Sequence, residues 1–242
     1  MILLLTGCIN PNGMTMTALS NQEERKRQYV EAIQFYLSNT SYPIVFSENS
    51  GTDISLYFKK EIKSGRLEYL SFSGNQNKEK GKGYGECEII QYALNNSQII
   101  HFAKDKRIAK ITGRLVIRNI TSIVRIHSLL FPQNTVFCSI NSDLSFPDSR
   151  FIIAPESFYH TFLKSKEIID DLQGYYFEHV LRDTIRKEKQ FPYSPFLLIP
   201  QIEGMSGSSG EIYKKEELSI SFAVKYLKYT YSQRHIFNRQ YR

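Results

Sequence analysis

The chain has 242 residues, of which 41% are hydrophobic and 23% are charged, so it is long enough to bury the core of an ordinary globular protein. Its formal charge of +7 suits a polyanionic partner, an anionic membrane surface or a phosphorylated substrate, and does not decide among them. No apolar stretch approaches the roughly 18 residues of a membrane-spanning helix, and the apolar run at 2–5 is too short for a secretory signal, which excludes both.

Apolar runs alternate with helical repeats over the first 115 residues. The expected strands are 1–9, 42–46, 67–72 and 108–111, and the expected helices are 20–37, a short one before residue 67, and one that follows the glycines at 81–85. Ser20 and Glu23 have the spacing of a capping box at the start of the first helix. This alternation predicts an α/β fold with a mostly parallel, Rossmann-like sheet flanked by helices.

The second half of the chain is less regular. The expected helices are 120–131, 155–170, 175–189 and 219–231, and the expected strands are 135–140, 151–154 and 196–202. Polar loops are expected at 141–150 and 203–210, and no repeat or linker divides the chain. We therefore expect one continuous domain, made of a Rossmann-like half at 1–115 and a second half at 116–242 that ends in a helical extension.

A glycine run, Gly81-Lys82-Gly83-Tyr84-Gly85, opens the helix that follows the third strand. It is not a P-loop, and it lacks the last glycine of a dinucleotide fingerprint. Free backbone N–H groups at the start of a helix suit a phosphate, so Lys82 and Gly83 are candidates for anion binding. The alternative is a turn that only lets the helix begin.

The strand at 108–111 ends in the polar segment Thr112-Gly113-Arg114. In an open α/β sheet, ligands bind at the carboxyl ends of the strands. Lys110 and Arg114 flank this segment, and Gly113 allows the backbone to approach a ligand closely. An anion is therefore expected here, unless Arg114 instead pairs with a structural carboxylate.

The order of glycine run, helix, strand and polar loop is similar to the centre of a GT-A nucleotide-sugar glycosyltransferase. The segments GKGYGE, YALNNS, KITGR, PDSRF and GMSGSSG resemble, more narrowly, glycosyltransferases from bacterial capsule and O-antigen clusters. The sequence departs from the general pattern where the Asp-x-Asp metal motif would stand, because it has Lys110 and Arg114 there. Positive side chains neutralise a departing diphosphate without a metal and repel one. From this departure we expect metal-independent transfer, with no metal-ligating residues.

The resemblance also implies a donor side and an acceptor side. The donor residues would be Thr6, Gly7, Cys8, Glu48, Asn49, Lys82, Gly83, Lys110, Thr112, Gly113 and Arg114. The acceptor residues would be Asp148, Ser149 and Arg150, with Ser206 in a loop that orders over the donor. Turns at 48–51 and a plain loop at 205–210 are the alternatives to these roles.

Proton transfer in an inverting enzyme of this kind requires a carboxylate near the start of a late helix. Glu178 is the best-placed carboxylate, and His179 is a second candidate base. A surface glutamate beside a packed histidine is the alternative.

Metal and disulfide chemistry have little support in the sequence. Cys8, Cys87 and Cys138 form no CxxC pair, so we expect neither a zinc site nor a disulfide framework, and an odd count fits a reducing compartment. Asp143 and Asp148 share one loop and suggest a displaced metal site only weakly, because an Asx-turn explains either residue. The other histidines, which lack convergent spacing, are read as core or surface residues: His101, His127, His160 and His235.

The function expected from the sequence is a cytoplasmic, inverting hexosyltransferase that takes a sugar from a nucleotide-sugar, a UDP-sugar by resemblance. Its acceptor would be a lipid-linked saccharide in capsule, O-antigen or lipopolysaccharide biosynthesis. The basic, aromatic C-terminal helix and tail would then contact the anionic inner face of the cell membrane. Two alternatives are a nucleic-acid-binding protein and a non-catalytic Rossmann-like nucleotide-binding protein. Nucleic acid is not expected as a partner, since the basic residues are scattered and no recognition motif is present.

Overall fold

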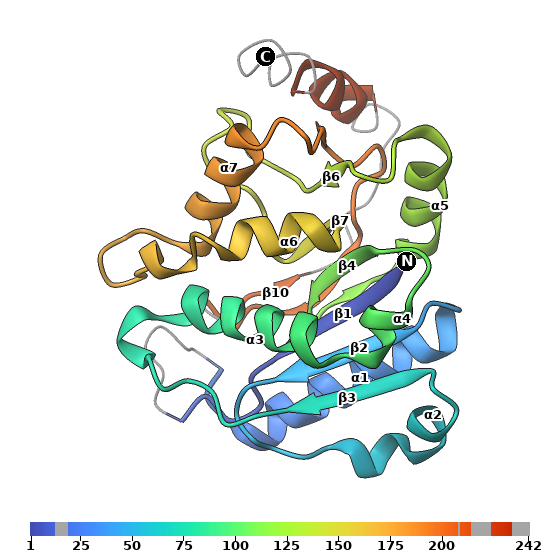
Figure 1. The fold of residues 1–242 in the computed structure, drawn as a ribbon, viewed down its shortest axis with the longest axis vertical. Helices are drawn as coiled ribbons and strands as arrows, with labels where there is room; N and C mark the ends of the chain where they lie inside the picture. The colour runs from blue at the N-terminus through green and yellow to red at the C-terminus, as the bar shows by residue number, and fades with distance from the viewer. Residues whose placement is uncertain (13–18, 208, 214–223, 234–242) are drawn as a thin grey trace.

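A seven-stranded sheet forms the centre of the protein in the computed structural model, which describes residues 1–12, 19–207, 209–213 and 224–233 (Figure 1). Its strands are β1 (Ile2–Gly7), β2 (Ile44–Glu48), β3 (Leu67–Ser71), β4 (Arg107–Thr112), β6 (Val136–Phe137), β7 (Phe151–Pro155) and β8 (Tyr193–Ser194). Their order is β3-β2-β1-β4-β7-β6-β8, in which β1 to β4 are parallel and β7 is antiparallel to β4. The α/β class and the mostly parallel sheet are thus confirmed.

A second, three-stranded sheet has the order β10-β9-β5. It joins β5 (Val116–Ile117), just after β4, to a hairpin of β9 (Ile202–Met205) and β10 (Ile212–Tyr213) from late in the chain. The small sheet therefore fixes the 202–213 hairpin beside the carboxyl end of β4.

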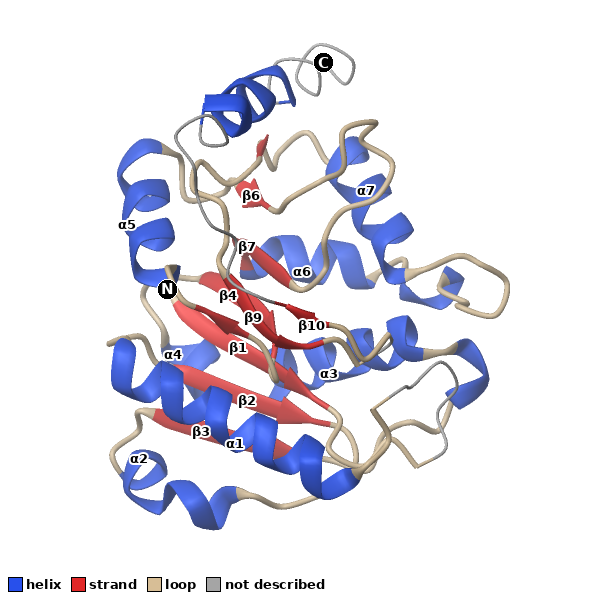
Figure 2. Cartoon of the chain, turned by 180° about the vertical axis from the view of Figure 1, so that it is seen from behind, coloured by secondary structure: helices blue, strands red, loops and turns tan. Residues whose placement is uncertain are grey.

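Helices cover both faces of the large sheet, as Figures 1 and 2 show from opposite sides. The helices are α1 (Gln22–Asn39), α2 (Lys59–Lys63), α3 (Lys82–Asn96), α4 (Gln98–Phe102), α5 (Ile120–Leu130), α6 (Glu156–Leu163) and α7 (Phe177–Lys187), with short 3₁₀ turns at η1 (Ser55–Phe58), η2 (Lys78–Lys80) and η3 (Lys166–Ile168). One buried cluster packs α3, α6 and α7 on one face, and another packs α1 and α5 on the other. Strands between two helical layers are buried on both faces, which explains their continuous apolar sequences.

The alternation of side chains along a strand decides which layer each residue meets. On β1, Leu4 belongs to the α3 cluster, whereas Leu3 and Leu5 belong to the α1 cluster. On β4, Ile111 likewise packs toward α1. Lys110, its neighbour, therefore points toward α3 and is almost completely buried there. The strand period thus places a charged side chain between the sheet and α3.

Several predicted boundaries are wrong. The first helix is capped by Asn21, whose side chain accepts from the backbone N–H of Glu24, and not by Ser20 with Glu23. The predicted strand at 196–202 does not form. It contains Pro200, and its backbone bonds to side chains instead. The N–H of Leu197 donates to His127 Nε2, and Asn119 donates to the carbonyl of Ile199.

Other predicted elements are shorter or shifted. The predicted strand at 135–140 is only the two residues of β6, and the predicted loop at 203–210 contains most of β9. The predicted C-terminal helix appears at 224–233, while 219–223 and the basic tail from 234 lie outside the described residues.

A buried tyrosine on α1 offers a test of this packing. The Tyr36 hydroxyl donates to the carbonyl of Leu115 and accepts from the N–H of Ile117, both at 2.9 Å. Tyr36→Phe should lower the free energy of unfolding by about 1–3 kcal/mol, because it leaves buried backbone groups without partners. Urea denaturation measures the loss, with Tyr42→Phe, a half-buried tyrosine, as the matched control. Equal stability of the two variants would contradict the role given to this hydroxyl.

Candidate functional site

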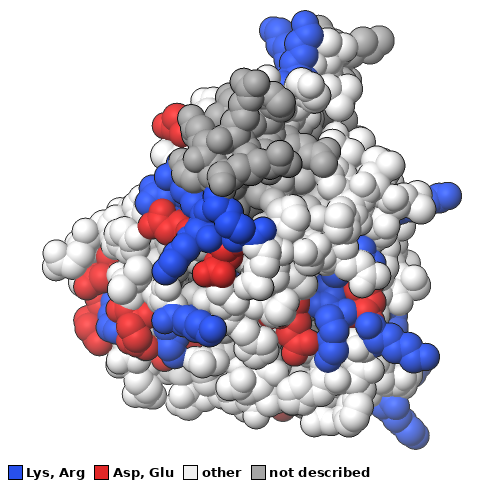
Figure 3. Space-filling view, turned by 45° about the horizontal axis from the view of Figure 1, so that its top comes forward, with Lys and Arg blue, Asp and Glu red and all other residues white. Residues whose placement is uncertain are grey.

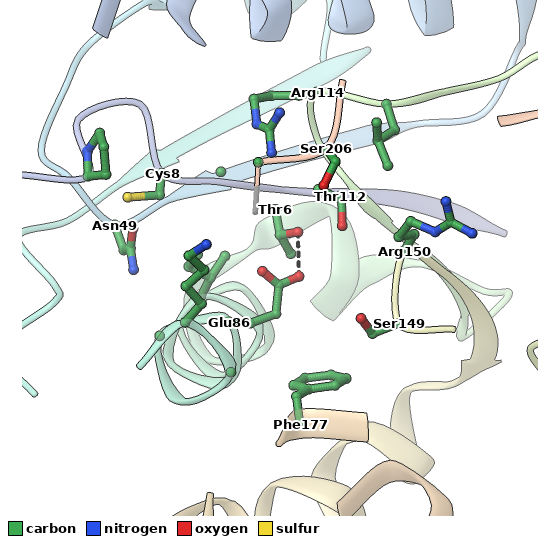
Figure 4. Close-up of a pocket in the computed structure, with 18 of the residues that line it drawn as sticks. Thr6, Cys8, Asn49, Glu86, Thr112, Arg114, Ser149, Arg150, Phe177 and Ser206 are labelled. Carbon is green, nitrogen blue, oxygen red and sulfur yellow. Dashed lines mark hydrogen bonds between the residues drawn. The ribbon is translucent and has the colours of Figure 1, made fainter. Parts of the chain in front are cut away.

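A cavity of about 380 Å³ opens at the carboxyl ends of β1, β2 and β4 (Figure 4). This edge of an α/β sheet is where ligands bind, and the volume suits a small molecule. Of the residues expected from the sequence, those that line it are Thr6, Gly7, Cys8, Asn49, Lys82, Gly83, Lys110, Thr112, Arg114, Ser149, Arg150, Glu178 and Ser206. Those that do not are Glu48, Gly113, Asp148 and His179.

The loop after β1 forms one wall of the cavity and is held by side chains of α1. Arg25 Nε donates to the carbonyl of Cys8 at 2.8 Å, and the N–H of Cys8 donates to the Tyr29 hydroxyl at 2.9 Å. Burial raises the pKa of the Cys8 thiol, so the sulfur stays neutral at neutral pH. The wall is therefore rigid, and its charge comes from Arg25.

Two predicted donor residues at the end of β2 have different surroundings. Asn49 lines the cavity and its amide donates to Asn75 Oδ1 at 2.7 Å. Glu48 is fully buried, and its carboxylate accepts from the N–H groups of Ser50 and Thr52 at 2.9 and 2.8 Å. The prediction that Glu48 faces the donor is wrong, because this carboxylate shapes the turn instead.

Gly113 is needed for packing between β1 and the end of β4. Its N–H donates to the carbonyl of Thr6 at 2.8 Å, and a Cβ there would lie 2.7 Å from the same oxygen. The glycine therefore lets two backbones approach each other, and not a backbone and a ligand as the sequence predicts. Thr112, its neighbour, lines the cavity.

A carboxylate occupies the N-terminus of α3. Asp171 Oδ2 accepts from the N–H of Gly83 at 3.0 Å, and a Cβ on Gly81 or Gly83 would crowd the same side chain. Burial raises the pKa of Asp171, while the backbone N–H groups of Gly83 and Lys82 lower it. The predicted phosphate site on free N–H groups of this helix is thus wrong, because an internal carboxylate caps them. The Lys82 side chain still reaches the cavity.

Lys110 forms a buried ion pair with Glu86 of α3. Its ammonium also donates to the carbonyl of Ser149 at 2.8 Å, and Glu86 accepts from the Thr6 hydroxyl at 2.7 Å, which Figure 4 draws as a dashed line. The charge of Lys110 is therefore matched inside the protein. It lines the cavity as predicted, but as half of an ion pair.

Four other cations of the described ranges line the cavity, namely Arg150, which pairs with Asp148, and a cluster of three made of Arg25, Lys82 and Arg114. The pKa of Lys82 falls to about 8, first because its ammonium is buried and then because the charges of Arg25 and Arg114 repel it. Because all three side chains line the same cavity, one bound anion could interact with each of them. An anion between them would relieve the repulsion.

Arg114 connects this cluster to the β9–β10 hairpin. Its Nη1 donates to the carbonyl of Met205 at 2.8 Å, and a Cβ on Gly207 would overlap the guanidinium. The alternative of a structural carboxylate for Arg114 finds no support, since its described partners are a carbonyl and the Gln28 amide. The glycine leaves room for the guanidinium under the hairpin.

Glu178 lies at the other end of the cavity, in the first turn of α7. The Ser149 hydroxyl donates to its Oε1 at 2.5 Å. Burial raises the pKa of the Glu178 carboxyl, while the Ser149 hydrogen bond and the charge of Lys110 act in the opposite direction. A carboxylate that is desolvated and oriented in this way is suited to accept a proton.

His179 points away from the cavity. Its Nδ1 accepts from the N–H of Tyr176 at 3.1 Å and so caps the start of α7. His179 is therefore a packed histidine, the alternative that the sequence offered. Its predicted role as a base is wrong, because its Nδ1 is already bonded to the backbone.

In the 148–150 segment, Asp148 pairs with Arg150, whereas Ser149 and Arg150 line the cavity. Asp148 binds Arg150 through two hydrogen bonds, from Nε at 2.8 Å and from Nη2 at 2.6 Å. Asp148 also accepts from the N–H of Arg150, and Asp143 accepts from the N–H of Ser145, so both carboxylates form Asx-turns. The Asx-turns that the sequence offered as the alternative to a metal site therefore account for both carboxylates.

Ser206 lies at the turn between β9 and β10. Its N–H donates to the carbonyl of Glu211 at 2.8 Å, and its hydroxyl accepts from the N–H of Ser209 at 3.1 Å. Figure 4 shows Ser206 beside Arg114 and Thr112, above the side of the cavity that holds Arg150. The hairpin thus covers part of the opening.

The sequence patterns did not indicate several lining residues: Pro11, Arg25, Tyr29, Glu86, Ile89, Leu115, Asp171, Tyr176, Phe177 and Tyr213. A signal existed for one of them. Arg25 lies on the buried stripe of α1 that continues through Tyr29. A charged residue on an apolar helical face indicates a buried polar site. Asp171, in an irregular loop, carries no such pattern.

Metal-binding groups are not gathered in the part of the chain that the structure describes, where no three His, Cys, Asp or Glu side chains could share an ion. His127 is a core residue whose Nδ1 pairs with the carbonyl of Ile123 at 2.6 Å, and His160 is an exposed residue near Glu156. His101 contacts the carbonyl of Leu94, and His235 lies outside the described residues. The reading of the described histidines as core or surface residues is confirmed.

No protein-family model matches this chain, and no curated protein matches its sequence. Solved structures with a similar arrangement include two kinds of transferase. A galactosyltransferase, LgtC, in complex with donor and acceptor sugar analogues, is 8% identical over 75% of this chain and 69% of its own, with a TM-score of 0.43.

The glycosyltransferase GlyE from Streptococcus pneumoniae TIGR4 is 8% identical over 81% of this chain and 44% of its own, with a TM-score of 0.47. A cytidylyltransferase from Leptospira borgpetersenii is 10% identical over 99% and 93% of the two chains, with a TM-score of 0.45. Similarities this distant assign no activity to the chain, so its function rests on the chemistry of the cavity.

Proposed function

We propose that this protein is a glycosyltransferase of the hexosyltransferase type, which moves a sugar from a nucleotide-sugar to a saccharide hydroxyl with inversion. The observation that carries the proposal is the content of one cavity. It combines the cations Arg25, Lys82 and Arg114 with the desolvated carboxylate Glu178. Clustered positive charge stabilises a departing diphosphate, and a carboxylate with a raised pKa suits a general base.

The nucleotide would occupy the end of the cavity near the loops after β1 and β2. Cys8 and Asn49 lie there, on the opposite side of the view in Figure 4 from Ser149 and Arg150. The Asn49 amide lines this end and suits a hydrogen bond to a base or ribose, whereas the N–H of Cys8 and the carbonyls of Thr6 and Cys8 are already bonded within the protein. The diphosphate would then lie among the three cations, and the sugar would point toward Ser149. A UDP-sugar is the donor that the sequence resemblance implies.

The transfer would be a single displacement at the anomeric carbon. The acceptor oxygen forms the new bond to that carbon while its proton passes to Glu178. The bond from the carbon to the diphosphate oxygen breaks, and its electron pair leaves with the nucleoside diphosphate. Ser149 keeps the Glu178 carboxylate oriented through the 2.5 Å hydrogen bond.

We also propose that the reaction needs no divalent cation. Fixed ammonium and guanidinium groups neutralise phosphate charge directly, and a guanidinium does so with two parallel hydrogen bonds. Lys82 and Arg114 would supply this charge, and Arg25, which lines the same cavity, would add to it. Lys110 contributes less than the sequence predicts, because Glu86 already pairs with it.

Turnover of the donor alone tests the function. The purified protein is incubated with a panel of UDP-, GDP- and CMP-sugars, while released nucleotide and the shift in Tm are measured. We expect slow hydrolysis of one UDP-sugar and a raised Tm with UDP. Neither binding nor hydrolysis of any nucleotide-sugar in the panel would refute the proposal.

Two alternatives receive less support. A nucleic-acid-binding protein would need basic side chains gathered on one face, but on the face that Figure 3 draws, acidic and basic side chains lie next to each other. Arg27, for example, pairs with Glu24 and Glu31. A non-catalytic nucleotide-binding protein would bind UDP but would need no desolvated carboxylate at Glu178. The variant Glu178→Gln separates the two functions, because only an enzyme would lose turnover.

The acceptor in this proposal is a lipid-linked saccharide of surface polysaccharide biosynthesis, met at the inner face of the membrane. No helix in the described ranges is long and apolar enough to cross a membrane. The helix at 224–233 docks through its inner side, where Gln233 donates to the carbonyl of Ile140 at 2.9 Å. Its outer side exposes Val224, Leu227 and Tyr231, at 47%, 54% and 73%. Two lysines beside these apolar groups would suit an anionic bilayer surface.

Removing those lysines should weaken binding to lipid. For the double variant Lys225→Ala/Lys228→Ala we expect about 2 kcal/mol less affinity, or roughly 30-fold, for vesicles that contain phosphatidylserine. Co-sedimentation measures it, with phosphatidylcholine vesicles and the variant Lys59→Ala/Lys60→Ala on α2 as controls. If both double variants bind anionic vesicles equally, the helix is not the contact.

A further inference from the structure

A second cavity of about 470 Å³ adjoins the first and shares Ser149, Arg150 and Glu178 with it. Its remaining wall comes from the segment at 139–148, which includes Asn141, Phe146 and Asp148. Glu178 therefore stands at the junction of two cavities. A group transferred between two bound molecules has to pass through such a junction.

The two cavities differ in charge. Among the described residues, five basic and three acidic side chains line the first, namely Arg25, Lys82, Lys110, Arg114, Arg150, Glu86, Asp171 and Glu178. One basic and two acidic side chains line the second, namely Arg150, Asp148 and Glu178. The first cavity thus favours an anion, and the second does not.

Arg150, the one basic residue that lines the second cavity in the described part of the chain, already has partners within the protein. Arg150 makes two hydrogen bonds to Asp148, and its guanidinium lies 4.5 Å from the centre of the Tyr213 ring. A carboxylate on its edge and an aromatic ring on its face compensate its charge. A phosphate in this cavity would meet the Glu178 and Asp148 carboxylates without a cation of its own.

Phe146 offers the second cavity a fixed aromatic surface. Its ring is 40% exposed, and it meets His179 edge to face, with ring centres 5.6 Å apart at 88°. The segment that carries it is tied to α7, because Arg186 donates to the carbonyl of Leu144 at 3.0 Å and Arg182 to that of Ser145 at 3.3 Å. A rigid, half-exposed ring costs little conformational entropy to bind against.

We infer that the second cavity is the acceptor subsite and that it takes an uncharged sugar unit. The apolar face of that sugar packs on Phe146, and its attacking hydroxyl reaches Glu178 at the junction. Asn141 and Asp148 line the same wall and suit the other hydroxyls. This inference rests on the proposed function and narrows it. It excludes a phosphorylated second substrate, such as the sugar phosphate that a nucleotidyltransferase joins to a nucleotide.

The test compares uncharged and charged acceptors in the full-length protein. The donor is the nucleotide-sugar that the protein is found to hydrolyse. Transfer of its sugar is measured to a set of para-nitrophenyl glycosides and to the same sugars as 1-phosphates. We expect transfer to at least one glycoside and none to the phosphates. Phe146→Ala should raise the KM for that glycoside about three- to tenfold, the size of one aromatic contact.

The control is Phe102→Ala on α4, since Phe102 is 80% exposed and lines neither cavity. Phe146→Tyr should restore the KM. Preference for the sugar phosphates, transfer to no glycoside, or an unchanged KM in Phe146→Ala would overturn the inference while donor hydrolysis persists. Absence of any nucleotide-sugar hydrolysis would instead overturn the proposed function, and the inference with it.

Discussion

The variant Glu178→Gln should lose about 10²- to 10⁴-fold in kcat, the usual contribution of a general base, and should keep its affinity for the donor nucleotide. The amide has the shape of the carboxyl group and still accepts from Ser149, so the fold of the site is preserved. What it lacks is a basic oxygen that can take the acceptor proton. Isothermal titration with UDP and a kinetic assay on the same sample separate the two effects.

The pH profile gives a second reading of the same residue. A base acts only when deprotonated, so kcat/KM should fall as the pH drops through the raised pKa of Glu178. On the alkaline side, kcat/KM should fall above about pH 8, where Lys82 in the free protein loses its charge. The two limbs predict a bell-shaped profile. Glu178→Gln should lose the acid limb and retain the alkaline one.

Glu23→Gln, on an exposed part of α1, is the matched control and should behave like the unaltered protein. Full activity in Glu178→Gln would remove the base from the mechanism. Loss of activity together with loss of UDP binding would point to a structural role. Unaltered UDP binding without any measurable transfer in the parent protein would favour a non-catalytic nucleotide-binding protein.

The parallel half of the fold could be predicted from the sequence because its signals are local. β1 and β2, for example, are apolar runs next to helical repeats, and every residue of these two strands is buried. The second half could not be predicted as well. Phe196 and its neighbours have the composition of a strand, but Pro200 interrupts the segment, and side chains such as Asn119 bind its backbone.

The candidate site shows the same division. Thr6, Asn49 and Arg114 could be found because they lie at or just after the carboxyl ends of strands, and the ends of parallel strands meet at one edge of a sheet. The pairing of Lys110 with Glu86 could not, because it depends on which face of β4 packs on α3. Asp171 was out of reach for a similar reason, since it caps α3 from a loop 88 residues further along the chain.

Lys82→Met should weaken binding of UDP by about 10- to 150-fold, which corresponds to the 1.5–3 kcal/mol of a hydrogen bond to a charged group. Methionine keeps the length of the side chain and removes its charge. The alkaline fall of kcat/KM above about pH 8 should disappear in the same variant, because the group that titrates there is gone. Titration calorimetry with UDP and a pH series of donor hydrolysis measure both effects.

Lys80→Met is the matched control, because Lys80 lies two residues earlier and pairs with Glu167 outside the cavity. UDP binding is then repeated with EDTA in the buffer. If fixed cations hold the diphosphate, EDTA leaves the affinity of the parent and of Lys80→Met unchanged, while Lys82→Met stays weak in either buffer. Equal affinities of the two lysine variants would remove Lys82 from the site. Loss of UDP binding in EDTA would show that a divalent ion carries the charge that we assign to these side chains.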